Sequence, residues 1–62
     1  MINRLSKVLE IKKMSGAELA RRIGISTDRL WKIANGVHDP SGKEMQAIAE
    51  TFHLPVNYIF EE

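Results

Sequence analysis

The sequence predicts an all-α fold, a compact bundle of five short helices built from the whole chain of 62 residues. Apolar residues recur at helical spacing, most regularly at Met45, Ile48, Ala49 and Phe52, which lie at i, i+3, i+4 and i+7. Typical helix start and stop residues separate the apolar segments, and no alternating pattern of a strand flanks them. A chain of this length supports only one small core, so we expect a single domain over residues 1–62.

The first predicted helix lies within residues 2–13, with Asn3 as a candidate N-cap. Its apolar residues fall on one face, at Ile2, Leu5, Val8 and Leu9. A second helix is expected from residue 16, because Ser15 and Glu18 have the spacing of a capping box. Gly24 ends it, since glycine tolerates the left-handed conformation found at many helix C-termini.

The remaining helices show the same signals. Ser26 is expected to cap a third helix, which ends at Asn35-Gly36. A loop leads to a second capping box at Ser41 and Glu44 and to the fourth helix. Pro55 fits the first turn of a short fifth helix, where its missing N–H costs nothing. The apolar residues expected to close the core from that helix are Val56, Ile59 and Phe60.

Residues 16–35, GAELARRIGISTDRLWKIAN, have the pattern of two short helices joined by a tight turn. The residues that fall where the two helices and their turn need them are Leu19, Ala20, Ile23, Gly24, Ile25, Leu30 and Ile33. This is the pattern of a helix-turn-helix, whose second helix enters the DNA major groove. The sequence therefore predicts a recognition helix at about residues 27–35.

Charge and composition narrow the functional classes. Residues 1–38 carry eight basic and three acidic side chains, whereas residues 39–62 carry one basic and five acidic. The basic part is compatible with a polyanionic partner, although solvated helix faces would give the same segregation. Cysteine is absent and His38 and His53 lack ligand-like spacing, so we expect no metal and no cofactor.

Neither membrane contact nor catalysis is expected. The chain lacks an apolar run long enough to span a bilayer, and its N-terminus is too charged for a signal peptide, which favours a cytoplasmic location. Nucleophile, base and orienting group do not occur together, so an enzyme is not expected.

Several positions give the chain a resemblance to a known family. They are Ser15, Glu18-Leu19-Ala20, Gly24-Ile25-Ser26, Ile33, Asn35-Gly36, Pro40, Ile48, Ala49, Phe52 and the segment 54–60. From about Leu5 to Phe60 the chain resembles the Cro and lambda-repressor type of DNA-binding domain, also called Xre-like. The resemblance implies the lambda-repressor-like fold and a prokaryotic or phage transcription regulator, in the simplest case a repressor that occupies an operator.

Three departures from that family pattern stand out. Gly16 replaces a glutamine that braces a DNA phosphate and a neighbouring side chain in many members. Leu9 and Ala34 replace an arginine and a glutamate that often form an ion pair. Both partners of that pair are absent together, which we interpret as an apolar contact in place of a salt bridge. Trp31 occupies a position that usually holds a small or polar residue.

The residues expected to contact base edges are Thr27, Asp28, Trp31 and Lys32, on the outer face of the recognition helix. Lysine can donate to guanine N7 and O6, aspartate can accept from cytosine N4, and threonine can do either. Asp28 also suits the first turn of any helix through the macrodipole, without DNA. Trp31 has three alternatives: the DNA groove, packing over the loop near Val37, or a protein interface.

The DNA backbone is expected to be contacted near helix starts and in the loop after the recognition helix, because free amides and the helix dipole attract phosphate. The candidates are Gly16, Ala17, Ser26, Asn35, His38 and Lys43. Arg29 is expected in a surface ion pair or on a phosphate.

Two functions of different classes remain open at this point. The first is a sequence-specific regulator that binds double-stranded DNA as a homodimer, with Val56, Tyr58 and Phe60 as candidate dimer residues. The second is a protein-interaction module, such as an antitoxin, that uses the same helical fold with Trp31 in a protein contact. Affinity for DNA should fall steeply with salt, whereas an apolar protein interface should respond little.

Overall fold

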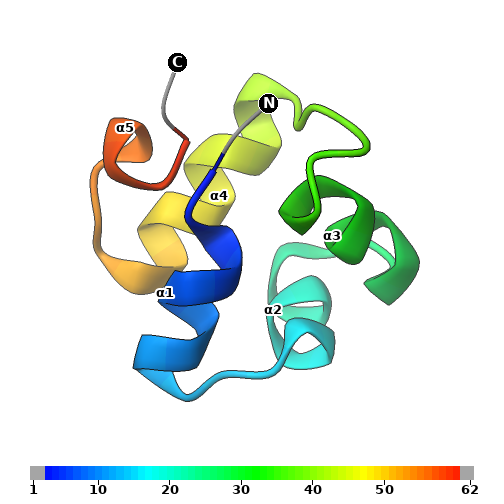
Figure 1. The fold of residues 1–62 in the computed structure, drawn as a ribbon, viewed down its shortest axis with the longest axis horizontal. Coiled ribbons are helices and arrows are strands. Elements are labelled where there is room, and N and C mark those ends of the chain that lie inside the picture. The colour runs from blue at the N-terminus through cyan, green and yellow to red at the C-terminus, as the bar shows by residue number, and fades with distance from the viewer. Residues whose placement is uncertain (1–2, 61–62) are drawn as a thin grey trace.

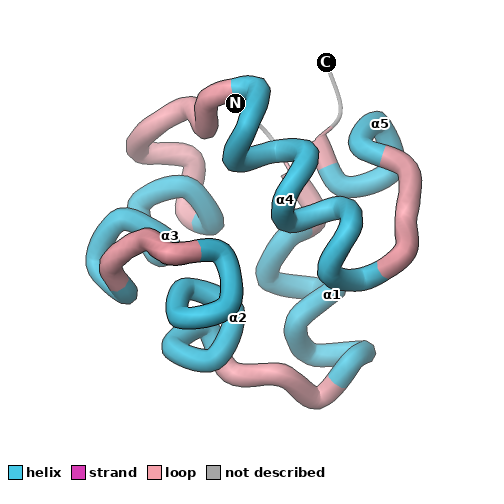
Figure 2. The backbone as a smooth tube through the Cα atoms, turned by 180° about the vertical axis from the view of Figure 1, so that it is seen from behind, coloured by secondary structure: helices cyan, strands magenta, loops and turns pink. Residues whose placement is uncertain are grey.

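The computed structural model describes residues 3–60 and contains five helices packed into one bundle (Figure 1). They are α1 (Leu5–Lys12), α2 (Gly16–Ile23), α3 (Thr27–Ala34), α4 (Gly42–Phe52) and α5 (Val56–Ile59). Figure 2 shows helices and loops only in the described part of the chain. The predicted all-α class and five-helix order are confirmed, except that α1 begins at Leu5 and Ile2 lies outside the described residues.

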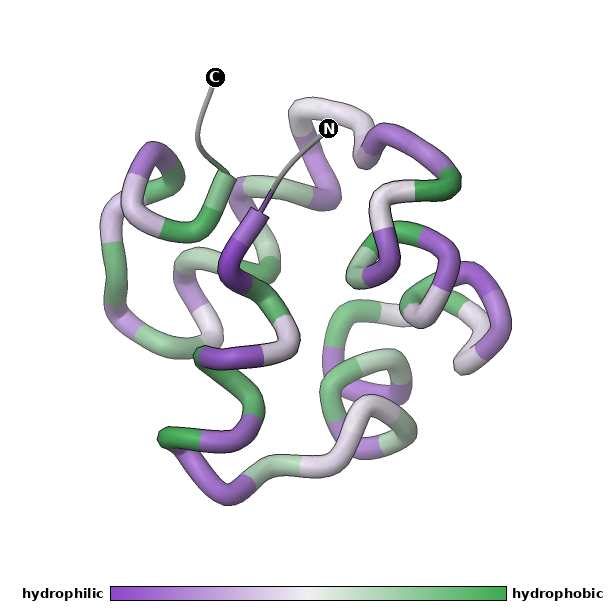
Figure 3. Tube along the Cα trace, in the orientation of Figure 1, coloured by the Kyte–Doolittle hydropathy of each residue, from purple (hydrophilic) through white to green (hydrophobic). Residues whose placement is uncertain are grey.

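Helix α4 packs against α2 on one side and α5 on the other, and α2 packs against α3. Each longer helix carries hydrophobic and hydrophilic segments in Figure 3, as expected where one face is buried and the other solvated. The buried apolar residues are Leu5, Val8, Leu9, Leu19, Ala20, Leu30, Ile33, Ile48, Ala49, Phe52, Ile59 and Phe60. The helix-turn-helix unit is thus attached to the bundle by its own apolar face.

Serine hydroxyls cap three helices, as predicted. Ser15, Ser26 and Ser41 accept hydrogen bonds from backbone amides three residues ahead, at 3.0, 3.0 and 3.1 Å. Ser41 and Glu44 complete a capping box, because the Ser41 amide donates to the Glu44 carboxylate at 2.8 Å.

The capping box predicted at Ser15 and Glu18 is only half formed. The Glu18 amide donates to Ser15, but the Glu18 carboxylate pairs with Arg21 and Arg22 one turn further along α2. Two guanidinium groups outcompete a single backbone amide for this carboxylate, because hydrogen bonds between ionised groups are stronger.

Residues in the left-handed conformation end α1, α2 and α4. Gly24 closes α2 with φ 78°, and the amides of Gly24 and Ile25 both donate to the Ala20 carbonyl. Lys13 and His53 adopt φ 57° at the ends of α1 and α4, where the sequence holds no glycine. These two ends therefore lack the signal that marks the end of α2.

The N-terminal segment ties the first and last helices together. The Asn3 carboxamide accepts a hydrogen bond from the Leu5 amide at 2.9 Å and donates to the Ile33 carbonyl at 3.0 Å. The Arg4 amide donates to the Ile59 carbonyl at 2.7 Å. The N-cap of α1 is therefore Arg4 and not Asn3 as predicted. Asn3 still satisfies the Leu5 amide at the start of α1, and it also holds the end of α3, which its sequence position does not reveal.

Helix α5 corrects two sequence-based assignments. Phe60 is only 2% exposed and belongs to the core, so it cannot serve as a surface residue for dimerisation. Val56 is 37% exposed and does not close the core as expected. Four residues make barely one helical turn, so the apolar positions of α5 cannot be assigned to a face by periodicity alone.

Candidate nucleic-acid interface

Helix α3 has one anchored face and one free face. Leu30 and Ile33 are fully buried, and they fix the helix on the core. The opposite face exposes Thr27, Asp28 and Lys32, three of the four residues predicted to contact bases. This face is solvated, as an interface with a DNA groove requires.

Asp28 and Lys32 form an ion pair with each other. The Lys32 ammonium lies 3.0 Å from the Asp28 carboxylate, one turn apart on α3, and both side chains are substantially exposed. An exposed pair of this kind contributes about 0–1 kcal/mol. A base edge or a phosphate can therefore displace either partner at little cost.

Arg29 links α3 to the start of α4. Its guanidinium donates two hydrogen bonds to the Glu44 carboxylate, at 2.6 and 2.8 Å, which places Arg29 in an ion pair as expected. The Glu44 side chain is 15% exposed and also accepts the Ser41 amide. The hydrogen bonds from Arg29, against the opposing effect of burial and with the help of Ser41, lower the pKa of Glu44 to about 2.

Acid should weaken the α3–α4 link through Glu44. The pKa of Glu44 is depressed in the folded state, so its contribution is complete above about pH 4.5 and is lost as the pH falls toward 2. We expect Glu44→Gln to flatten this part of the stability–pH curve. The acid-induced loss in the free energy of unfolding should be smaller in this variant than in the unsubstituted chain. The difference is only about 1 kcal/mol, because Arg29 is partly exposed. Urea unfolding at several pH values measures it.

Arg29→Gln removes the other partner and should flatten the same range of pH. Glutamine at position 44 keeps a side chain that can complete the capping box, so the cap is not lost with the charge. An acid-induced loss of stability in Glu44→Gln that equals the loss in the unsubstituted chain would exclude Glu44 as its source.

The charged residues of the helix-turn-helix unit are all engaged in ion pairs. Between residues 16 and 35 they are Glu18, Arg21, Arg22, Asp28, Arg29 and Lys32. The basic surplus of the first 38 residues is therefore partly compensated within this unit. Arg21 and Arg22 remain mostly exposed at the end of α2, so phosphates can still reach them.

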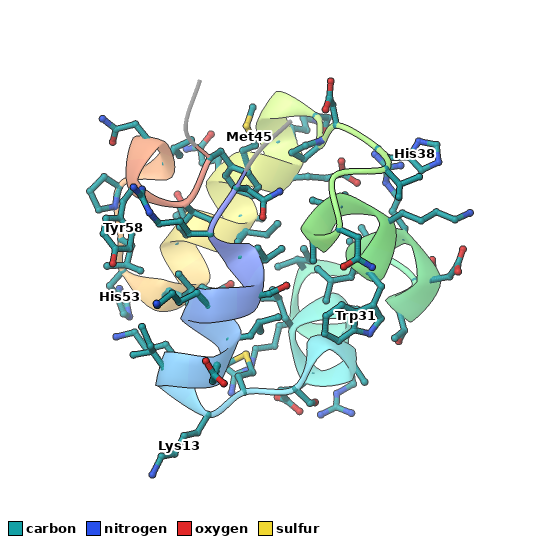
Figure 4. The ribbon with its side chains drawn as sticks, viewed as in Figure 1. Lys13, Trp31, His38, Met45, His53 and Tyr58 are labelled. Atoms are coloured by element: carbon teal, nitrogen blue, oxygen red, sulfur yellow. The ribbon has the colours of Figure 1, made fainter. Side chains whose placement is uncertain are left out.

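Trp31 lies against Gly16 at the start of α2 (Figure 4). A Cβ atom added to Gly16 would lie 2.5 Å from Cζ2, 2.7 Å from Cε2 and 3.0 Å from Nε1 of the indole. Gly16 is buried, whereas Trp31 keeps 41% of its surface exposed. The indole covers the first turn of α2, and Val37 is 68% exposed.

The residues predicted to contact the DNA backbone differ in accessibility. Gly16 is buried beside the indole, and Ala17 is exposed on the same turn. The Ser26 hydroxyl is already engaged with the Arg29 amide. The exposed candidates beyond α3 are Asn35, His38 and Lys43, and the His38 side chain projects outward from the loop (Figure 4).

The sequence profile of the helix-turn-helix family matches residues 4–59, which include all five helices. The chain belongs to the Cro-type helix-turn-helix family. In this helix-turn-helix domain α2 and α3 form the motif, and α1, α4 and α5 supply the core on which it rests. Domains of the family bind DNA, and DNA binding is the activity that membership assigns. Among curated proteins, none matches the chain significantly.

Sequence reasoning missed two features of the helix-turn-helix domain. The partner of Arg29 is Glu44, which lies on another helix and carries a capping signal of its own. The contact between Gly16 and Trp31 could have been predicted from the sequence, because both residues depart from the family pattern. Considered as a pair, a missing side chain and an oversized one suggest mutual packing.

Among the helices of residues 3–60, none has the length and apolar character needed to cross a membrane.

Proposed function

We propose that this helix-turn-helix domain is a sequence-specific transcription regulator, a repressor that occupies operator DNA as a dimer. The observation that carries the proposal is the free polar face of α3, held on the core by Leu30 and Ile33. A rigid helix that presents polar side chains to solvent is the element that reads base edges in the major groove.

The side chains of this face have complementary base preferences. Lys32 suits guanine, through N7 and O6, and Asp28 suits the amino group of cytosine. Because the two form an ion pair in the free domain, a site that satisfies both replaces one pair by two new contacts. Random DNA offers Lys32 a phosphate but leaves Asp28 facing negative charge. The pair therefore favours discrimination over affinity.

A dimer is proposed because one short helix contacts too few base pairs for strong specificity. Val56 and Tyr58, 37% and 46% exposed, are the apolar residues available on α5 for this role. Arg4 lies over the Tyr58 ring, 5.3 Å from its centroid, and donates to the Tyr58 carbonyl at 2.7 Å. Tyr58 lies on the other side of the molecule from His38 in Figure 4, so dimerisation there leaves α3 free.

Selection of binding sites from random duplexes tests the proposal. We expect a recurrent sequence arranged as two half-sites related by two-fold symmetry. Measured on that sequence, log affinity should fall with log salt with a slope of about −3 per protomer, if about three cations of each domain neutralise phosphates. A single short half-site would refute the dimer, and no enrichment of any sequence would refute the regulator.

A protein-interaction module is the second candidate, and the exposed indole of Trp31 favours it. Large aromatic side chains are frequent at the centres of protein interfaces. The charged residues of α2 and α3 also have ion-pair partners already, so a phosphate must compete with those partners for them. A protein partner bound with little dependence on salt, together with failure of the duplex selection, would support this candidate.

A further inference from the structure

Gly16 and Trp31 form a packing unit between the two helices of the motif. The edge of the indole rests on the bare backbone of the first turn of α2, where even a methyl group would collide with Cζ2 and Cε2. Glycine is required here for close approach, because the position leaves no room for a side chain while the indole is in place. The absence of a side chain at 16 and the large ring at 31 are therefore one structural feature.

Packing alone holds the indole in this place. Within residues 3–60 the Trp31 side chain has no hydrogen-bond partner in the protein, and 41% of the residue stays exposed. On α3, Trp31 lies one turn from both Thr27 and Asp28 and directly precedes Lys32 in the chain. The indole thus adjoins the face proposed to read bases, on the side that meets α2.

We propose that Trp31 is a positioning residue for DNA recognition and acts through Gly16; the inference rests on the proposed function. Leu30 and Ile33 fix the inner face of α3 on the core, and the indole fixes its outer side on α2. The contact sets the distance between the start of α2, where a phosphate contact is expected, and the base-reading residues of α3. Both contacts must fit one duplex, so a small shift costs specificity.

A double-mutant cycle on Gly16 and Trp31 tests this inference. Gly16→Ala should force the indole off α2 and lower affinity for the selected duplex at least about fivefold, with little change for random DNA. In a Trp31→Ala background the same Gly16→Ala change meets no ring. It should then leave affinity unchanged and slightly raise thermal stability, because alanine is the better helix former. Affinities are compared where circular dichroism shows every variant fully folded.

Gly42→Ala is the matched control. Gly42 also follows a capping serine at the first position of a helix, but a Cβ there would have nothing within 4 Å. This variant should keep both affinities. Trp31→Phe, which keeps an aromatic ring over Gly16 and removes the N–H, should keep most of the discrimination between the selected duplex and random DNA.

Three results would overturn the inference. The first is an equal effect of Gly16→Ala in both backgrounds. The second is a double-mutant cycle in which the two substitutions are non-additive in thermal stability, while the ratio of specific to random affinity is the same in all variants. The third is a loss in Trp31→Phe as large as in Trp31→Ala, which would assign a direct DNA contact to the N–H. If the unsubstituted chain binds every duplex equally well, the proposed function fails as well. The double-mutant cycle measured by thermal stability still tests whether Gly16 and Trp31 pack together.

Discussion

Lys32→Ala is expected to lower affinity for the selected duplex by about 10- to 100-fold, the range found for loss of one good base contact. Affinity for random DNA should fall much less, because one phosphate contact among several is lost. The substitution removes a surface side chain from α3 and leaves Leu30 and Ile33 in the core, so the fold should remain intact. Fluorescence anisotropy with both duplexes gives the two affinities.

Asp28→Asn is the companion variant to Lys32→Ala. It frees Lys32 from its ion pair and removes the negative charge that faces phosphates, so affinity for random DNA should rise. The ratio of specific to random affinity should therefore fall, here because binding to random DNA becomes stronger. Equal losses for both duplexes in Lys32→Ala would reduce Lys32 to a phosphate contact, and unchanged random affinity in Asp28→Asn would assign Asp28 to the helix dipole alone.

Leu30→Ala is expected to destabilise the domain by about 3 kcal/mol, because it opens a cavity beneath the recognition helix. Leu30 is fully buried in the core that joins α2, α3 and α4. A domain of this size has a total stability near the lower end of about 5–15 kcal/mol. The melting temperature should fall by more than about 10 °C, and DNA binding should fall with the folded fraction.

Leu30→Met is the control of similar volume and should cost less than about 1.5 kcal/mol. Thermal unfolding followed by circular dichroism compares the two variants. A loss below about 1 kcal/mol in Leu30→Ala would show that α3 is not anchored by this residue. The recognition helix would then depend mainly on Ile33 and on its contacts with Gly16 and Glu44.

Local sequence signals account for most of the fold. The capping serines, the glycine at the end of α2 and the apolar spacing of α4 act within one or two helical turns, so they can be read without knowledge of the tertiary structure. Where a local signal failed, a competing group was present. Glu18 has the spacing of a capping box, but Arg21 and Arg22 are within its reach, and the ion pairs prevail.

By itself, the sequence determined the all-α class, the order of the helices and the outward face of α3, because these depend on periodicity and on helix ends. Only the tertiary structure decided what each exposed or unusual residue contacts. Phe60 is buried, Arg29 meets Glu44, and the indole of Trp31 rests on Gly16, fifteen positions away in the chain. Such contacts depend on how helices cross in space, and residue spacing within one helix does not specify which side chains of another helix it will meet.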